Sequence, residues 1–139
     1  MGYIRDEMIK PIFIGGIVGG VLFSISILSY YCLSYVLSGA ITAYLIGRKF
    51  DPTDKDYIIA GGLSGGIAGL VSWCLDTLII LMLGIPLLAN YCSPDEIYME
   101  MMIATEWLMM NIPLYLLIGI ISGAIGGILY GKLRRYMVR

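Results

Sequence analysis

The chain has 139 residues, of which 59% are hydrophobic and 14% are charged, and its net charge is −1. Soluble domains usually have about a quarter of their residues charged, so this composition excludes an ordinary soluble protein and indicates a polytopic membrane protein. The near-neutral charge gives no electrostatic basis for binding nucleic acid, and the absence of histidine argues against a zinc site.

The first uncharged run extends from Ile12 to Gly47. As one helix it would measure about 54 Å, whereas the hydrocarbon core of a bilayer is about 30 Å thick. We therefore expect a hairpin of two spans at about residues 11–29 and 31–47. The turn is expected near residues 28–33, where polar and aromatic residues interrupt the aliphatic ones.

A charged loop, Arg48–Asp56, separates this hairpin from a third apolar run. Asp51-Pro52 is typical of a turn, and an aspartate can cap the helix that follows. The third span is expected at about residues 57–83, where Gly84-Ile85-Pro86 ends or kinks it.

The segment at about residues 94–110 has an amphipathic pattern. Ser93 to Glu96 form a capping box with proline at the first helical position. Apolar residues share one face, and four carboxylates lie mostly on the opposite face: Asp95, Glu96, Glu100 and Glu106. We expect a helix lying in the membrane interface, because the alternative, a longer fourth span, would bring these carboxylates into the membrane. The last span is expected at about residues 113–133.

Glycines recur at four-residue spacing in the spans. This spacing places them on one helix face, where a neighbouring backbone can approach closely. The glycines expected at helix contacts are Gly15, Gly16, Gly19, Gly20, Gly39, Gly61, Gly62, Gly65, Gly66, Gly69, Gly119, Gly123, Gly127 and Gly131.

The same glycine pattern suggests an internal repeat. A GG-x-x-GG stretch followed by SGAI and L-x-G-[RK] occurs twice, with the second copy lengthened by an insert at residues 83–111. A true duplication would give two αα-hairpins related by an axis along the membrane normal. The alternative is that glycine-rich apolar segments align easily without common descent.

The basic residues predict the topology. In a four-span arrangement all nine Lys and Arg residues fall on one side of the membrane. The positive-inside rule makes that side cytoplasmic. We therefore expect a multi-pass protein of the plasma membrane with both termini in the cytoplasm.

Asp76 is the one ionisable residue within an expected span. Intramembrane carboxylates often serve ion or proton pathways, which makes Asp76 the candidate pathway residue. The alternative is an aspartate near the outer interface, bonded to Ser72 or Thr77.

The cysteines and methionines give weaker indications. Cys92 could pair with Cys32 or Cys74, or all three could remain free. The methionines after Cys92 resemble a soft-metal set, but methionine at helical spacing is more often an apolar filler. We expect no metal site and no cofactor.

The order GG-x-x-GG, SGAITAYLIGR, charged loop, AGGLSGGIAG and SGAIGGILYGKLRR resembles a family of small, uncharacterised archaeal membrane proteins with four spans. The resemblance covers roughly residues 11–75. Ala43-Tyr44-Leu45 matches part of the AGYL element of that family, with Thr42 and Ala43 where Ala-Gly would stand. The resemblance implies an all-α membrane fold and brings no known activity.

These patterns together predict four transmembrane helices, packed through glycine faces as two repeated hairpins, and an interfacial helix. Two functions remain open. The first is a non-catalytic structural or assembly subunit that associates, through small-residue faces, with further copies or with another membrane protein. The alternative is a small channel or transporter that uses Asp76 and the groove between the hairpins. We expect no enzyme activity, because no nucleophile–base pair is present.

Overall fold

The computed structural model describes residues 6–25, 31–49 and 51–137, and the regular elements in these ranges are all helical. The prediction of an all-α fold is confirmed. The elements are α1 (Asp6–Ile25), α2 (Tyr31–Lys49), α3 (Asp54–Ile79), the π-helical turn η1 (Ile80–Gly84), α4 (Ile85–Leu88) and α5 (Pro94–Met137). The turn expected near residues 28–33 lies mostly outside the described residues.

Three segments of the described chain are long and apolar enough to cross a membrane: Asp6–Ser24, Asp54–Leu88 and Pro94–Met137. Helix α2 is not one of these segments. Its 19 residues include two basic residues in the last turn and several hydroxyl-bearing side chains, which lower its hydropathy. The structure therefore has the apolar helices of a membrane protein, and in the described chain three segments are both long enough and apolar enough to span a membrane.

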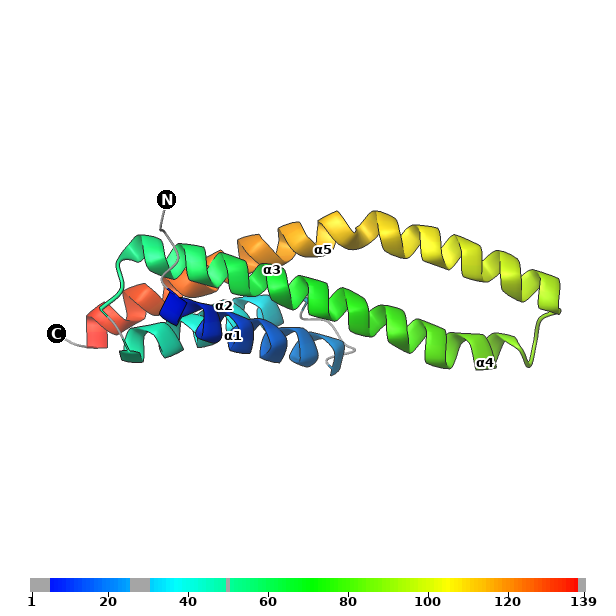
Figure 1. Ribbon diagram of the computed structural model, residues 1–139, viewed down its shortest axis with the longest axis horizontal. Coiled ribbons are helices and arrows are strands. Elements are labelled where there is room, and N and C mark those ends of the chain that lie inside the picture. The colour runs from blue at the N-terminus through cyan, green and yellow to red at the C-terminus, as the bar shows by residue number, and fades with distance from the viewer. Residues whose placement is uncertain (1–5, 26–30, 50, 138–139) are drawn as a thin grey trace.

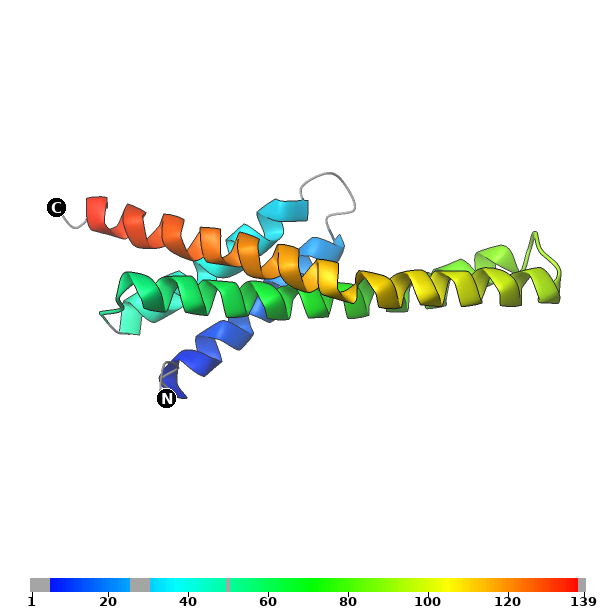
Figure 2. The same cartoon turned by 90° about the horizontal axis from the view of Figure 1, so that it is seen from above.

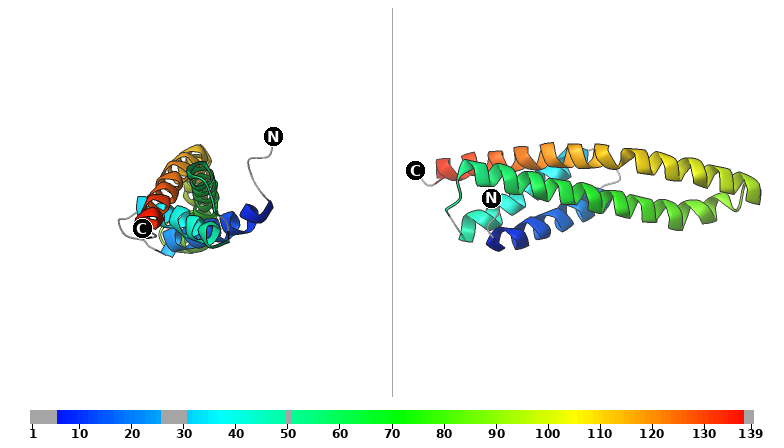
Figure 3. Two further views of the ribbon diagram at one scale, coloured as in Figure 1. Left: turned by 90° about the vertical axis from the view of Figure 1, so that its left-hand side faces the viewer. Right: turned by 45° about the horizontal axis from the view of Figure 1, so that its top comes forward.

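The starts of α1 and α3 lie at the same end of the molecule as the ends of α2 and α5 (Figure 1). Helix α1 crosses α3 obliquely when the molecule is seen from above (Figure 2). The hairpin formed by α3, α4 and α5 extends well beyond α1 and α2 (Figure 3). We call residues 77–107 the distal hairpin, and the rest of the described chain the proximal bundle.

Two apolar clusters join the helices of the proximal bundle. One buried cluster joins Met8 and Ile12 of α1 to Ile46 of α2 and Ala60 of α3. Towards the other end of α1, the rings of Phe23 and Tyr35 stack with centroids 4.9 Å apart. The two clusters tie α1 and α2 to the same side of α3.

Helix α5 differs from the two separate segments expected at residues 94–110 and 113–133. It is continuous for 44 residues, with Pro113 inside it. The capping box starts it as expected, since the backbone N–H of Ser93 donates to Glu96 Oε2 over 2.8 Å. Its length of about 66 Å is twice the thickness of a hydrocarbon core. Prolines are tolerated within membrane helices when neighbouring groups satisfy the freed backbone carbonyl, so a proline by itself does not end such a helix.

The segment after residue 79 continues past residue 83, the expected end of the third span, and an irregular turn lies beside Gly84, where an end or a kink was expected. The helical path continues through η1 and α4 to Leu88, with the wider turn of η1 taking up the irregularity. Pro86 lies at the start of α4, directly after the π-helical turn. An aspartate was expected to cap α3, but its N-cap is Thr53. Asp56 takes part as the N3 residue of the capping box, where its Oδ2 accepts from the backbone N–H of Thr53 over 2.8 Å.

Candidate functional site

Helices α3 and α5 approach each other closely at their glycines. A Cβ atom added at Gly61 would lie 2.5 Å from the carbonyl oxygen of Gly123. One added at Gly65 would overlap the carbonyl oxygen of Gly119 and lie 2.9 Å from the Cα of Gly123. The two backbones are therefore in direct contact, with no room for a side chain between them.

Gly123 also faces α2. A Cβ atom added at Gly39 would overlap the carbonyl group of Gly123. One added at Gly126 would overlap the carbonyl oxygen of Val36. The sequence analysis missed Gly126, although it stands beside Gly127 as a pair like the others. Gly123 thus marks the point where α2, α3 and α5 meet.

The glycine pairs of α1 divide their contacts between two helices. Gly19, the first of its pair, faces Ser38 of α2, whereas Gly20 faces Val71 of α3. Gly15 and Gly16 show the same alternation, with Gly15 against Thr42 and Gly16 against Ile67. Each pair therefore lets α1 approach two neighbours at once.

Three fully buried hydroxyl groups join α1, α2 and α3 at this crossing. The Ser38 and Ser64 hydroxyl oxygens are 2.7 Å apart, and Thr42 donates to Ser64 over 2.7 Å. Ser38 also lies 2.8 Å from the carbonyl oxygen of Gly15, to which its hydroxyl donates. These hydroxyls are bonded to protein groups, which removes the cost of burying them in an apolar interior.

The contacts between helices are not the same in the two expected repeats. The backbones of α2 and α3 pack closely. The equivalent pair under a two-fold relation is α1 and α5, which within the described residues meet through the edge contact between the rings of Phe23 and Tyr115, with centroids 6.1 Å apart, and without a close approach of their backbones. The repeat therefore remains a prediction from the sequence.

Asp76 lies on α3 where the proximal bundle ends. It is partly buried, and its Oδ2 accepts a hydrogen bond of 3.0 Å from the hydroxyl of Tyr115 on α5. The expected partners bond elsewhere: Ser72 donates to the carbonyl of Ala68, and Thr77 donates to that of Trp73. The sequence analysis placed Tyr115 only in an interfacial belt and missed this contact, which depends on the pairing of α3 with α5.

A small hollow of about 210 Å³ lies beside this contact. Its lining is mainly aromatic and aliphatic, with one amide side chain, that of Asn111, and Asp76 is not part of it. The arrangement holds a carboxylate at the seam between two helices, next to a hollow whose lining is mostly apolar.

The remaining candidate residues do not form a ligand site. Cys74 and Cys92 are both free thiols, so the Cys74–Cys92 disulfide is absent. The side chain of Cys32 lies outside the described residues. The four carboxylates of the distal hairpin are exposed, and the described residues contain no group of three or more Cys, Asp or Glu side chains able to hold a metal ion.

Every glycine named in the sequence analysis as a helix contact is buried.

Comparison with family models gives a match over residues 9–136 to a family of uncharacterised proteins described as the MJ1491 transmembrane domain. Searches of curated proteins and of solved structures found no significant match. The family match extends from the first turns of α1 to the last turn of α5, and the resemblance to an uncharacterised membrane protein family is confirmed. The chain therefore belongs to the MJ1491 transmembrane domain family.

Proposed function

We propose that this membrane domain is a non-catalytic structural or assembly subunit, whose role is to associate with other protein at the membrane. The observation that carries the proposal is the unpartnered apolar surface of the distal hairpin. Its large exposed apolar residues are Leu78, Ile79, Ile80, Leu81, Met82, Leu83, Leu87, Met99, Met102, Ile103 and Trp107.

The association surface differs from the one expected from the sequence. The glycine faces are buried within the chain, so they are not free to bind a partner. We propose that these faces hold the proximal bundle together, and that the distal hairpin makes the contacts with other protein.

The length of the hairpin supports this role. Helix α1 has 20 residues and is about 30 Å long, which matches the hydrocarbon core. The distal hairpin extends about 20 Å beyond the end of α1. Part of its apolar surface therefore lies outside the layer of lipid that α1 can span. Apolar surface beyond the lipid is stabilised when another protein covers it.

The proposed partner is a second copy of this chain. A copy inserted in the same orientation presents an apolar hairpin of equal length at the same depth. The two surfaces then cover each other along their whole length, which a partner with a shorter apolar segment does not achieve.

We also propose that four helices cross the plasma membrane and that both termini are cytoplasmic. The support is the position of the bases. Arg48 and Lys49 end α2, Lys55 lies in the first turn of α3, and the last turn of α5 is also basic. These helix ends lie together at one end of the bundle (Figure 1), as the positive-inside rule requires for a cytoplasmic face.

The mass of the protein in a mild detergent tests the assembly role. We expect an oligomer, and we expect the double variant Met82→Ser, Met99→Ser to shift it to the monomer. The matched control is Phe13→Ser with Ile17→Ser, which removes apolar groups of similar exposure from α1. The proposal is contradicted if the wild-type protein is a monomer, or if both double variants shift the oligomer to the monomer to the same extent.

A channel or transporter is the second candidate. The observation that favours it is the partly buried Asp76 carboxylate at the seam of α3 and α5. Ion or proton flux into liposomes containing the protein tests this function, with Asp76→Asn expected to abolish the flux. Absence of flux, or flux that Asp76→Asn leaves unchanged, excludes a pathway through Asp76.

A further inference from the structure

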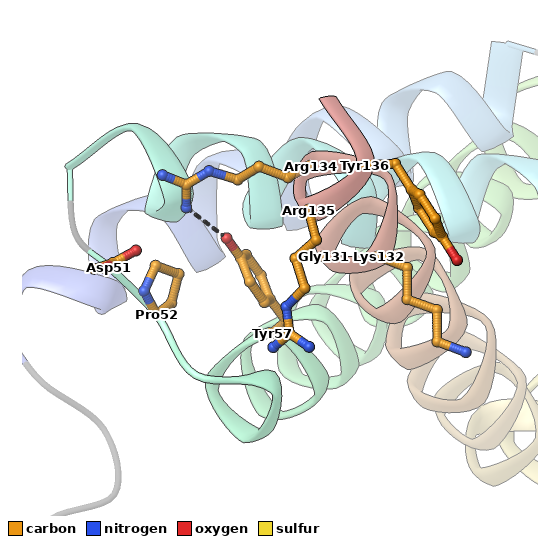
Figure 4. Close-up of a pocket in the computed structure, with 8 residues that line it drawn as sticks. All are labelled: Asp51, Pro52, Tyr57, Gly131, Lys132, Arg134, Arg135 and Tyr136. Carbon is orange, nitrogen blue, oxygen red and sulfur yellow. Dashed lines mark hydrogen bonds between the residues drawn. The ribbon is translucent and has the colours of Figure 1, made fainter. Parts of the chain in front are cut away.

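A second cavity opens at the basic end of the bundle, far from Asp76. It has a volume of about 590 Å³ and lies between the connection of α2 to α3 and the last turns of α5. Arg134 and Arg135 extend from α5 toward Tyr57, and Asp51 and Pro52 approach from the connection (Figure 4).

Tyr57 forms the floor of this cavity, and two glycines leave the space that it needs. The ring of Tyr57 is 3% exposed and lies against Gly131, where an added Cβ atom would be 2.9 Å from the ring. A Cβ atom added at Gly47 would lie 3.0 Å from the Tyr57 hydroxyl and 3.1 Å from Nη1 of Arg134. Both glycines therefore leave the space that the tyrosine and the guanidinium occupy.

Arg134 is oriented before any ligand arrives. Its Nη1 donates to the Tyr57 hydroxyl over 2.9 Å. A guanidinium has five N–H donors in a planar fork that fits the oxygens of a phosphate. Among the described contacts Arg134 uses one nitrogen, which leaves the opposite edge of the fork for a ligand.

The other charges of the cavity favour an anion. Lys132 and Arg135 line it together with Arg134, whereas Asp51 is the one carboxylate in its lining. Arg135 pairs with Asp54, but both side chains are more than half exposed, so this ion pair is weak and a phosphate can replace the carboxylate.

Aromatic residues place this cavity at the level of lipid headgroups. Tyr130 makes edge contacts with Tyr44 and with Tyr57, the residue that forms the floor. Tyrosines concentrate at the boundary between membrane and water. Basic pockets between membrane helices at this boundary bind the headgroups of anionic lipids.

We propose that this cavity binds a phosphate group, presented by the headgroup of an anionic phospholipid, with Arg134 as its main contact. The proposal does not depend on the assembly role, because it concerns the opposite end of the molecule. A free soluble phosphate has the same chemistry, and the experiment separates the two sources.

The experiment uses the full chain in a zwitterionic detergent and three probes: phosphatidylglycerol, phosphatidylcholine and inorganic phosphate. We expect phosphatidylglycerol to bind, and Arg134→Gln to weaken that binding about fivefold or more, as loss of one basic contact predicts. Lys132→Gln is a second variant on an exposed side chain, which tests the cavity even if Arg134→Gln impairs folding. The control is Lys49→Gln, an exposed base of the same end that does not line the cavity.

Each outcome has a clear meaning. Binding of phosphatidylglycerol that the cavity variants weaken and the control does not supports a lipid ligand. Binding of inorganic phosphate with the same dependence supports the site and assigns a soluble ligand. Equal binding of phosphatidylcholine, or equal weakening by Lys49→Gln, overturns the proposal, because diffuse surface charge then explains the binding.

Discussion

The two parts of the long α3–α5 hairpin are both apolar, but their helices are held in different ways. In the proximal bundle glycines bring the backbones of α3 and α5 into contact, as Gly65 and Gly119 show. In the distal hairpin Met82 and Met99 are among the side chains that point outward, 74% and 65% exposed. Past Trp73, whose Nε1 donates to the carbonyl of Leu108, the two helices share few contacts.

This difference shows that hydropathy alone does not hold membrane helices together. Lipid chains are as apolar as leucine, so a helix gains little by leaving lipid for an apolar neighbour. Close packing of small residues and buried hydrogen bonds distinguish protein contact from lipid contact. The proximal bundle has both, whereas the distal hairpin has an apolar surface without them. The predictions below test this difference in order of decreasing effect.

The largest effect is expected from Gly123→Ala. The added methyl group would overlap the carbonyl oxygen of Gly61 and lie 2.8 Å from the Cα of Gly65, so α3 and α5 must separate. We expect a loss of about 3 kcal/mol or more in the free energy of unfolding, measured by denaturation in detergent. The matched control is Gly84→Ala in the distal part, where the nearest atom is a side-chain carbon 3.7 Å away. Equal losses in both variants would show that the glycine contact does not hold the bundle.

Neighbouring glycines of α3 provide a sharper version of the same test. Gly61→Ala brings a methyl group 2.5 Å from a carbonyl oxygen, whereas Gly62→Ala meets its nearest atom at 3.6 Å. We expect Gly61→Ala to lower the melting temperature. Gly62→Ala should leave it unchanged or raise it, because alanine is the better helix former by about 1 kcal/mol. A lower melting temperature for Gly62→Ala than for Gly61→Ala would contradict the packing described above.

A smaller effect is expected from Ser64→Ala at the hydroxyl cluster. The change removes the partner of both Ser38 and Thr42, and each lost bond is worth about 1 kcal/mol in a membrane bundle. The measurement is again the free energy of unfolding in detergent. Thr105→Ala is the control, since Thr105 is exposed and bonds only within its own helix, to Met101. A loss for Thr105→Ala as large as that for Ser64→Ala would refute a special role for the cluster.

The smallest effect is expected from Met82→Ser in the distal hairpin. The side chain is largely exposed, so its removal costs no packing within the chain. We expect the unfolding free energy of the monomer to change by less than about 0.5 kcal/mol. A loss comparable to that of Ser64→Ala would mean that the distal hairpin is packed within one chain after all.

Some of the fold followed from local patterns. The capping box at Ser93 is complete within four residues, and it predicted the start of α5. The equally local box at Thr53 was missed, and α3 starts three residues before the expected span. The glycines at four-residue spacing are buried, but the spacing does not say which helix each one faces. Pro113 and the carboxylates before it predicted a break that α5 does not have. A proline within a membrane helix is tolerated or not according to its surroundings, which the local sequence does not give.

The candidate site was less accessible to sequence reasoning. Asp76 was found because a carboxylate in an apolar run is conspicuous, whereas its partner Tyr115 is 39 residues away. The cavity beside Arg134 requires Gly47, Tyr57 and Gly131 from three helices, and no one stretch of the sequence contains its pattern.

The sequence by itself determined that the chain forms apolar helices with its bases gathered at their ends, since hydropathy and charge are properties of each segment alone. The tertiary structure decided which faces meet, where the bundle stops and where the cavities lie. These features depend on the depth and direction at which helices cross. A shift of one residue along a helix turns it by about 100° and replaces one neighbour with another.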